Sequence, residues 1–427
     1  MVSPVSFPRY ITRPLLAALA DTPVVMLVGA RQTGKSTLAQ GLSASQHPAA
    51  YVTLDEASVL SSAQADPVGF LAEHQGPVII DEIQRVPALL PAIKADVDRR
   101  RRPGRYLLTG SANVLVLPRI SESLAGRMEV LTLWPLAQGE IEERPGNFVD
   151  EVFAAGSPAR HPVSAGGRRA LLERALRGGF PEAVQRESAD RRRAWFDAYI
   201  TTILQRDVRD LARIESLTVL PRLLTLIAAR APAPTNVADL GRAAGLAQTS
   251  LRRYLSLLEM TFLVRSVPAW ARNLTKRLVR APRLILTDTG LLAHLAGWSG
   301  PGLEQEPTAA GPLIENFILM EIIKVASWSR RRPDVSHFRT HAGHEVDVVL
   351  EDEAGRVVGV ETKAAASVSE RDFRGLEALR ETAGKRFHRG VVLYAGRDVL
   401  PFGRDRWAMP IESLWPAGRA EGRADQR

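Results

Sequence analysis

A phosphate-binding loop near the start of the chain constrains its fold more than any other feature. Residues 25–38 read VMLVGARQTGKSTL, which completes the pattern GxxxxGK[ST] directly after an apolar run. In such a loop the glycines let backbone N–H groups wrap the phosphates, the lysine reaches the β and γ phosphates, and the following hydroxyl binds Mg²⁺. The sequence therefore predicts a site for ATP and Mg²⁺ formed by Gly29, Ala30, Arg31, Gln32, Thr33, Gly34, Lys35, Ser36 and Thr37.

A second motif supplies the carboxylates that ATP hydrolysis requires. The apolar run 78–80 reads VII and ends in Asp81 and Glu82, which is the Walker B pattern. We expect Asp81 to hold Mg²⁺ through water and Glu82 to polarise the water that attacks ATP. The alternative is a strand end that the two acids merely cap. Together with the loop, this motif predicts that ATP is hydrolysed and not only bound.

Polar residues after the next strand complete the expected catalytic set. An apolar strand at 106–109 is followed by Ser111 and Asn113, where a sensor of the γ-phosphate sits. Arg127 stands in a Gly-Arg turn before a further strand, so we expect it to reach a phosphate in cis or from a neighbouring subunit. Alternating strands and helices indicate an α/β fold with a parallel sheet and the nucleotide at the carboxyl ends of its strands. The expected catalytic residues are Lys35, Glu82, Ser111, Asn113 and Arg127.

Composition narrows the classes of protein further. The chain has 427 residues, 45% hydrophobic and 24% charged, as is usual for globular proteins. It has no apolar run of about 20 residues and no apolar leader, so we expect a cytoplasmic protein without a membrane segment. The absence of Cys excludes disulfides, thiolate nucleophiles and Cys-ligated zinc. A net charge of +9 makes DNA or RNA a candidate partner, although an Arg-rich composition alone would also produce it.

The middle of the chain is expected to be helical. A Gly- and Pro-rich connection at 154–169 leads to helices at 237–244 and 249–260, and strands follow at 263–266 and 284–286. This order is typical of a winged helix-turn-helix, and the alternative is a lid that contacts protein. Residues on the second helix and in the wing are expected to meet phosphate, namely Arg252, Arg253, Asn273, Lys276, Arg277 and Arg280.

The last part of the chain has the element order of a restriction-endonuclease-like fold. After a linker expected at 300–311, the pattern predicts a helix, three strands, a helix and a strand, at 312–326, 336–340, 345–350, 356–362, 369–382 and 390–394. Polar residues in the second and third of these strands match that fold's PD-(D/E)xK signature, although the signature's Pro is absent.

These strands carry a second candidate metal site. A hairpin turn centred near residue 354 would place Asp347 opposite Glu361 on one face, with Lys363 two residues further on. Paired carboxylates repel unless a cation or a proton lies between them. We therefore expect a second Mg²⁺ held by Asp347, Glu361 and Glu315, with Lys363 orienting a water for phosphodiester cleavage. The alternative is a solvated hairpin face or a nuclease-like fold without activity.

Taken together, these strings resemble a group of bacterial and archaeal AAA-type ATPases whose carboxy-terminal region is a domain of unknown function. The matching strings are GARQTGKSTL, VIIDEIQ, LLTGSAN, LAGR, GGFPEAV, LQRDVRDL, NLTKRLVRAPRLILTDTGLL, RTHAGHEVDVVLE and VGVETK. The resemblance implies ATP binding, a winged-helix middle and a nuclease-like end, without a known substrate. Lys276, Arg277, Asp288 and Gly290 fall on the group's recurrent NxxKR and DxGL strings, for which a salt bridge or lid packing is the simplest explanation.

Two functional hypotheses follow. In the first, the ATP state controls a nucleic-acid-binding winged helix and a nuclease-like domain; in the second, the chain is a nucleotide-controlled signalling switch with a catalytically silent last domain. An oligomer is compatible with both. The expected divisions are an ATPase domain, a linker with a helical lid, a winged helix, a nuclease-like domain and a tail, at 1–150, 151–215, 216–298, 299–415 and 416–427.

Overall fold

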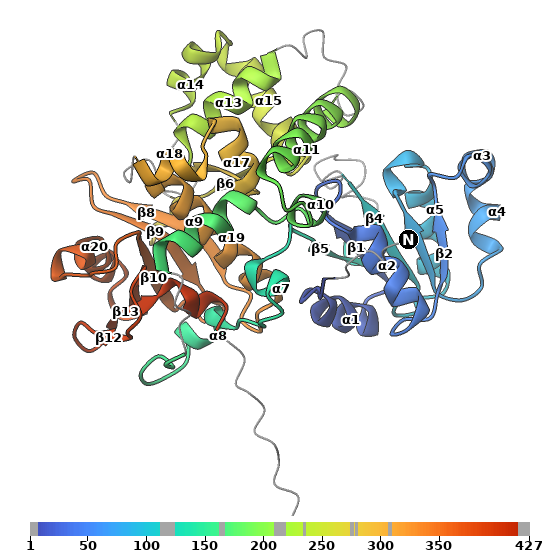
Figure 1. The fold of residues 1–427 in the computed structure, drawn as a ribbon. Helices are drawn as coiled ribbons and strands as arrows, with labels where there is room; N and C mark the ends of the chain where they lie inside the picture. The colour runs from blue at the N-terminus through green and yellow to red at the C-terminus, as the bar shows by residue number, and fades with distance from the viewer. Residues whose placement is uncertain are drawn as a thin grey trace, which may run out of the picture.

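The computed structural model describes most of the chain (Figure 1). The described residues are 7–111, 124–161, 167–208, 219–233, 236–273, 277, 281–305 and 310–416, of which 206–208 are described by their backbone alone. Among them, no helix is both long enough and apolar enough to cross a membrane.

The first part of the chain forms a five-stranded parallel sheet, as the sequence predicts. Its order is β2-β3-β4-β1-β5, and the strands are β1 (Val24–Val28), β2 (Ala50–Thr53), β3 (Val78–Asp81), β4 (Tyr106–Gly110) and β5 (Met128–Thr132). Every residue of β1, β3 and β4 is buried, because helices cover both faces of an α/β sheet. The helices that follow these strands or precede them are α1 (Thr12–Asp21), α2 (Lys35–Ala44), α3 (Ala57–Ala65), α4 (Pro67–Ala72) and α5 (Leu89–Arg99).

The parallel pairing brings the carboxyl ends of three strands to one edge of the sheet. In the registered pairs, Val28 of β1 lies beside Gly110 of β4, and Ile80 of β3 lies beside Leu108. The loop after β1 and the acids after β3 therefore meet at this edge, where a doubly wound sheet binds its ligand.

Short helices dominate the middle of the chain. They are α7 (Gln138–Ile141), α8 (Phe148–Val152), α9 (Gly167–Arg177), α10 (Pro181–Val184), α11 (Ala189–Thr202), α13 (Val219–Arg230), α14 (Val237–Ala244) and α15 (Gln248–Met260), with a π-helical segment at Ile203–Val208. Asn236 caps α14 by accepting from the N–H groups of Ala238 and Asp239, and Gly245 ends it with a φ of +69°. Strands β6 (Val264–Val267) and β7 (Arg283–Leu286) then pair antiparallel.

The segment between these two strands differs from a free wing. It joins the carboxy-terminal sheet, where Ala269 bridges His337, Trp270 N–H donates to His337 O, and His337 N–H donates to Pro268 O. Trp270 is fully buried against that sheet. Residues 268–270 are therefore not available as part of a wing that meets phosphate, because their backbone and the Trp270 side chain are used inside the molecule.

The carboxy-terminal part contains a six-stranded mixed sheet of order β12-β13-β11-β10-β9-β8. Its elements are α17 (Thr289–Ala296), α18 (Gly300–Gln305), α19 (Ala310–Trp328), β8 (Asp334–Arg339), β9 (Glu345–Glu351), β10 (Val357–Lys363), α20 (Arg374–Ala383), β11 (Phe387–Tyr394), β12 (Leu400–Pro401) and β13 (Arg406–Pro410). The predicted order of helix, three strands, helix and strand is confirmed in the run from α19 to β11.

The two expected linkers are more structured than their composition suggests. Residues 300–305 form α18, and α19 begins at Ala310, so most of the stretch 300–311 is helical where it is described. In the connection at 154–169, Arg389 on β11 donates to the carbonyl oxygens of Ala154 (3.1 Å) and Gly156. A long-range side chain thus fixes backbone that Gly and Pro content alone would make mobile.

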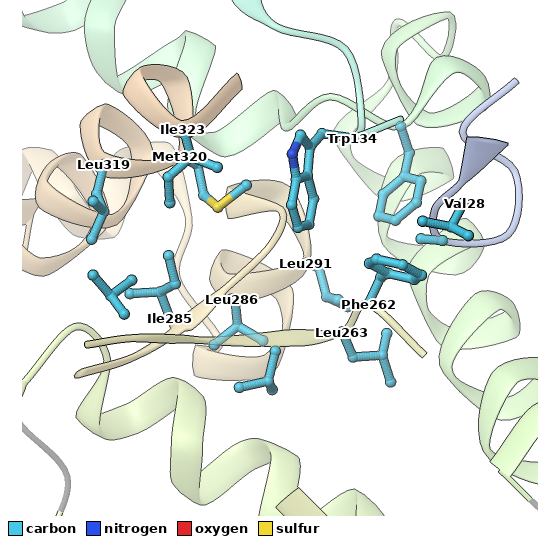
Figure 2. Packing of buried hydrophobic residues seen from close by; sticks show 14 of the residues in the cluster. Val28, Trp134, Phe262, Leu263, Ile285, Leu286, Leu291, Leu319, Met320 and Ile323 are labelled. Carbon is cyan, nitrogen blue, oxygen red and sulfur yellow. The ribbon is translucent and has the colours of Figure 1, made fainter. Parts of the chain in front are cut away.

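One hydrophobic cluster runs through all parts of the molecule. Figure 2 shows Trp134, which follows β5, between Met320 on α19 on one side and Phe262 and Val28 on the other. The rings of Trp134 and Phe262 meet edge to face, with their centroids 5.8 Å apart. Because α19 is apolar around most of its circumference, it packs at once on the middle helices and the last sheet.

Candidate nucleotide site and a carboxylate cluster

The phosphate loop has a backbone path that its glycines permit. A Cβ on Gly29 would lie 2.2 Å from the carbonyl oxygen of Leu133, and Gly34 has a φ of +92° at the start of α2. Lys35 is buried, and its Nζ donates to the carbonyl oxygens of Gly29 (2.9 Å) and Ala30 (2.8 Å). The ammonium therefore lies inside the loop that precedes the helix, where an anion would be bound.

Arg9 ties this loop to the rest of the molecule. Its guanidinium donates to the carbonyl oxygens of Thr33 (2.6 Å) and Trp134 (2.6 Å), and Nε forms an ion pair with the buried Glu140 at 3.2 Å. Sequence reasoning missed Arg9, because a single Arg before a helix in an Arg-rich chain carries no motif. Its three partners lie 24 to 131 residues away, so only the tertiary fold shows its role.

Asp81 lies at the end of β3 within a group of hydroxyls. Tyr51 Oη donates to its Oδ2 at 2.8 Å, and the Thr109 hydroxyl donates to its Oδ1. Burial and the interaction with Asp81 raise the pKa of Tyr51 above its ordinary value, and the Ser36 side chain also interacts with that phenol. Ser36 and Asp81 thus lie around one hydroxyl, and such oxygen donors are the ones that suit Mg²⁺.

Glu82 is connected to the expected sensor through a glutamine. Gln84 Nε2 donates both to the carboxylate of Glu82 and, at 2.9 Å, to Oγ of Ser111. Glu82 has a φ of +60°, a conformation that is costly for a residue with a side chain and that is concentrated at functional sites. The structure therefore brings Glu82 and Ser111 together at the carboxyl ends of β3 and β4, whereas Asn113 lies outside the described residues.

Arg127 lies at the wrong edge of the sheet for a contact in cis. It directly precedes β5, and its carbonyl oxygen accepts from the N–H of Val24 at the start of β1. Its Nε pairs with Asp98 at 2.5 Å. The carboxyl ends of the same strands carry the phosphate loop, so the expectation in cis is wrong for this arrangement. A contact in trans stays a prediction.

Tyr199 on α11 contacts the phosphate loop. The Tyr199 hydroxyl donates to the carbonyl oxygen of Arg31 at 3.5 Å, and its ring stacks on Trp195 with the centroids 5.0 Å apart. Phe180, from the GGFP string, packs against Tyr199 at 4.7 Å. The helical region after β5 therefore contacts the nucleotide edge directly.

The recurrent Gly-Gly-Phe-Pro and Asp-x-Gly-Leu strings meet in one buried junction. Asp288 accepts from the N–H of Gly179 (2.6 Å) and from that of Leu291 (2.8 Å), which caps α17. Gly179 O in turn accepts from Leu136 N–H at 2.7 Å. A Cβ on Gly290 would lie 2.8 Å from Arg177 O, so close packing explains that glycine. These residues join the middle helices to the chain that leaves β5.

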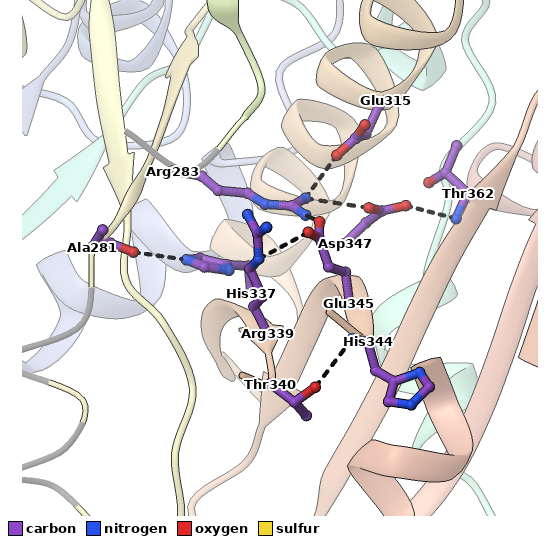
Figure 3. A network of polar contacts seen from close by, with 10 residues as sticks. All are labelled: Ala281, Arg283, Glu315, His337, Arg339, Thr340, His344, Glu345, Asp347 and Thr362. Carbon is purple, nitrogen blue, oxygen red and sulfur yellow. Dashed lines mark hydrogen bonds and ion pairs between the residues drawn. The ribbon is translucent and has the colours of Figure 1, made fainter. Parts of the chain in front are cut away.

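The carboxylates expected in the second site do come together. The pairing of β9 with β10 aligns Val348 with Val360, which brings the preceding Asp347 next to Glu361. Asp347 Oδ2 accepts from Thr362 N–H at 2.9 Å, and Glu315 reaches the same place from α19 (Figure 3). Burial and the neighbouring Asp347 raise the pKa values of Glu315 and Glu361 well above their ordinary range.

A buried arginine lies among these carboxylates. Figure 3 shows Arg283 of β7 pointing into the cluster, where Nη1 lies 2.7 Å from Glu315 and 3.2 Å from Asp347, and Nη2 lies 2.8 Å from Glu345. Its side chain is 2% exposed. The sequence held a signal for this residue, because Arg283 is the one charge in the apolar strand RLIL, and a buried charge needs partners.

Lys363 does not join the cluster. Its Nζ pairs with Asp372 in the segment before α20, and its side chain is 43% exposed. Within the described ranges, no three His, Asp or Glu side chains have the arrangement of a metal site. The expected second Mg²⁺ site is therefore not formed in this arrangement, because the guanidinium of Arg283 occupies the space between Glu315 and Asp347.

The basic residues expected to meet nucleic acid fall into three groups. Arg277 forms an ion pair with Glu351 at 2.5 Å and lies over the Trp270 ring, so it is used within the protein. Lys276 and Arg280 lie outside the described residues. Arg252 and Arg253 are exposed on α15, as the helix-turn-helix interpretation requires, while Asn273 makes contacts within the protein.

Three family models match consecutive parts of the chain. Residues 21–142 match an AAA domain, residues 168–302 match a domain of unknown function, DUF8612, and residues 310–414 match a domain of unknown function, DUF4143. Among solved structures, a variant of Thermotoga maritima RuvB aligns with a TM-score of 0.28 and 17% identity over 61% of this chain and 90% of that chain. A STAND-type signal transduction ATPase from Pyrococcus horikoshii gives 0.20 and 12%, over 76% and 48%. Neither score supports a functional argument.

Two mycobacterial proteins match almost the whole chain. The uncharacterized proteins Rv2008c of Mycobacterium tuberculosis and Mb2031c of Mycobacterium bovis are each 32% identical over 411 residues, which is 95% of this chain and 84% of theirs. The AAA match covers the phosphate loop, Asp81 and Glu82. The chain is thus an AAA-type ATP-binding protein, and it belongs to the family that includes these two mycobacterial proteins.

Proposed function

We propose that this protein hydrolyses ATP at the carboxyl edge of the five-stranded sheet. The observation that carries the proposal is the position of Glu82, which directly follows β3 and is linked through Gln84 to Ser111. Lys35 and the backbone N–H groups of the loop bind the phosphates, while Ser36 and Asp81 hold the Mg²⁺ that neutralises charge developing in phosphoryl transfer. Glu82 orients and polarises the attacking water.

Two substitutions separate binding from hydrolysis. Lys35→Ala should abolish binding of a fluorescent ATP analogue, because the loop loses the charge that faces the phosphates. Glu82→Gln should bind the analogue as the wild type does but release phosphate at least about a hundredfold more slowly, the usual contribution of a positioned general base. Phosphate release at the wild-type rate by the Glu82→Gln protein would contradict the assignment of Glu82.

We further propose that the ATP state is transmitted to the carboxy-terminal carboxylate cluster. Arg9 joins Thr33 of the loop to Trp134, and the Arg265 guanidinium of β6 lies over the Trp134 ring at 5.1 Å. Two residues further along β6, Val267 pairs with Arg283. The path from the phosphate loop to the cluster therefore consists of direct contacts and the pairing of β6 with β7.

A second connection runs from the chain after β5 to α19. Lys324 Nζ donates to Leu136 O at 2.9 Å, and Glu321 accepts from Gln138 N–H at 2.8 Å while pairing with Lys324. All of these groups are buried, so movement of either region must move the other or break the bonds. Coupling of this kind requires an element with two arrangements, and the β6-β7 hairpin is our candidate for it.

The output that best fits the cluster is metal-dependent cleavage of a nucleic acid, with the exposed Arg252 and Arg253 on α15 as its binding surface. The four carboxylates of the cluster favour metal-dependent cleavage. The buried Arg283 instead favours the second hypothesis, a switch whose last domain has no catalytic activity. ATPase and nuclease assays with Mg²⁺ or Mn²⁺ on single- and double-stranded DNA and RNA distinguish the two. Salt-dependent stimulation of hydrolysis and cleavage that Asp347→Asn abolishes would support the nuclease. An unchanged ATPase rate with no cleavage would leave the switch.

A further inference from the structure

The Arg283 guanidinium and the carboxylates around it come from parts of the chain that are separate in the fold. Arg283 belongs to the β6-β7 hairpin, whereas its partners belong to α19 and β9. Asn316 on α19 clamps the hairpin in place by accepting from Leu286 N–H (3.1 Å) and donating to Leu286 O (2.9 Å). The Arg283 guanidinium therefore lies in the cluster because the β6-β7 hairpin docks on α19.

The cluster contains more negative charge than this arginine can balance. Glu315, Glu345, Asp347 and Glu361 are four carboxyl groups, and the one fully buried cation among them is Arg283 within the described part of the chain. Arg339 forms an ion pair with Glu345 at 3.0 Å, and its side chain is half exposed. Buried charge without compensation is costly, so this cluster favours a cation with more charge than one guanidinium supplies.

One oxygen of the cluster has no hydrogen-bond partner. Glu361 Oε2 is buried and accepts nothing, although Glu361 neighbours both Asp347 and Glu315. Unsatisfied buried acceptors are rare in folded proteins and are explained by an ion, a water or a functional constraint. A divalent cation would satisfy this oxygen and also provide twice the charge of a guanidinium, with carboxylate ligands of the kind that Mg²⁺ and Mn²⁺ prefer.

Arginine and metal cannot occupy the cluster together in this arrangement. Nη1 of Arg283 lies within 3.2 Å of both Glu315 and Asp347, which is the space that an ion bridging these two carboxylates would need. Binding of the ion therefore requires that the guanidinium withdraw, and docking of the guanidinium requires that the ion leave.

We propose that Arg283 is a tethered internal cation that keeps the carboxylate cluster closed to Mg²⁺ or Mn²⁺, and that undocking of β7 opens it. This inference rests on the proposed function in that the cluster is the site under ATP control. It assigns the regulation of that site to the protein's own arginine, so that the resting molecule is inactive without any separate inhibitor.

Metal binding by the full-length protein tests the proposal without a nuclease assay. Isothermal titration with Mn²⁺, in the absence of ATP, should show a site in Arg283→Ala that is at least about tenfold tighter than in the wild type, because the competing state is removed. Arg283→Lys is the matched control, since it keeps a tethered positive charge and should resemble the wild type. Adding Asp347→Asn to Arg283→Ala should remove the site.

Two further measurements keep the proposal open to refutation. If Arg283→Ala is unstable without metal, Mn²⁺ should raise its unfolding temperature, and Asp347→Asn should cancel that rise. Failure of Mn²⁺ to bind or stabilise a folded Arg283→Ala protein that still binds ATP would overturn the proposal. Equal Mn²⁺ binding by the wild type, lost in Asp347→Asn, would overturn it as well.

The nuclease activity and the closure of the cluster by Arg283 can be refuted independently of each other. An Arg283→Ala protein that binds Mn²⁺ through Asp347 but cleaves no DNA or RNA would refute the nuclease activity and leave the internal cation intact. Cleavage by the wild type at the rate of Arg283→Ala would support the nuclease and refute the closure by Arg283.

Discussion

Arg265 stacks over the indole of Trp134, with its guanidinium carbon 5.1 Å from the ring centroid. Trp134 follows the last strand of the ATPase sheet, and Arg265 lies in the strand that pairs with β7. Burial lowers the pKa of Arg265, and the nearby charge of Glu259 opposes this effect. A cation held on an aromatic face can shift without breaking an ion pair, which suits the change with nucleotide state that we propose for this contact.

Replacing Arg265 by Met should uncouple the hairpin from the nucleotide site. Addition of ATP and Mg²⁺ is expected to change the amide hydrogen exchange of β6 and β7 in the wild type, and this change should be lost in Arg265→Met while ATP binding persists. Arg253→Met, on the exposed face of α15, serves as the control. An identical response of the hairpin in both variants would exclude the ring contact as the coupling element.

Gly29→Ala should damage the phosphate loop through one carbon atom. Its Cβ would lie 2.2 Å from Leu133 O, which is backbone and cannot move aside, so a loss of about 1–3 kcal/mol in unfolding free energy is expected together with weaker ATP binding. Gly41→Ala on α2 is the matched control. No atom lies within 4 Å of its added Cβ, so it should gain about 0.5–1 kcal/mol from helix propensity. Urea denaturation measures both, and equal stabilities would contradict the steric argument.

Asp288→Asn should weaken the junction between the middle helices and the chain after β5. The carboxylate accepts from Gly179 and Leu291, and an amide can accept at only one of its two positions, so one buried N–H loses its partner. The expected cost is about 1–3 kcal/mol in denaturant titrations. Asp190→Asn, exposed at the start of α11, should be close to neutral. A neutral Asp288→Asn would show that the junction tolerates the missing acceptor.

Asp352 should contribute stability that acid removes. Burial alone would raise its pKa, but hydrogen bonds from the side chain and backbone of Arg356 lower the pKa below its ordinary value. A carboxylate with a lowered folded pKa stabilises the protein above its unfolded pKa of about 3.9, and the contribution disappears as the pH falls through the folded pKa.

The matching variant is Asp352→Asn. At pH 7 its free energy of unfolding should be about 1–3 kcal/mol lower than that of the wild type, and it should unfold at a lower temperature. The stabilities of the two proteins should converge as the pH falls below about 4. Asp239→Asn on α14, where the side chain is 44% exposed, should show no such convergence because it starts near the wild type. A difference in stability between the two proteins that persists at low pH would mean that the charge of Asp352 is not what stabilises the fold.

Local sequence motifs predicted the nucleotide site at the carboxyl edge of the five-stranded sheet. Each residue of these motifs either lies close to the others in the sequence or follows a strand of that one parallel sheet. Lys35, Asp81 and Ser111 needed only the rule that carboxyl ends of such strands meet. The same rule would have placed Arg127 correctly, since a residue just before a strand lies at the opposite edge. The helix and strand order after residue 310 was also readable from periodicity.

Long-range contacts were beyond the sequence. Nothing local connects Arg283 to Glu345 or Asp347, and the pairing depends on how the β6-β7 hairpin docks on α19. The segment containing Trp270 resembled a wing because the preceding elements favour one, yet its large apolar ring and free backbone groups pair with β8. Lys363 had the spacing of a signature, but the neighbouring Asp372 offered a closer partner.

The position of α19 inside the shared cluster has a consequence for synthesis. Val28 and Trp134 pack in the same core as Met320 and Ile323, so the core around the first-made region is complete only after this helix has left the ribosome. Nascent chains that stop before residue 310 would expose the apolar surface that α19 covers, and they are expected to be targets for chaperones and proteases. The apolar surface that the ATPase sheet shares with α19 is therefore covered only late in synthesis.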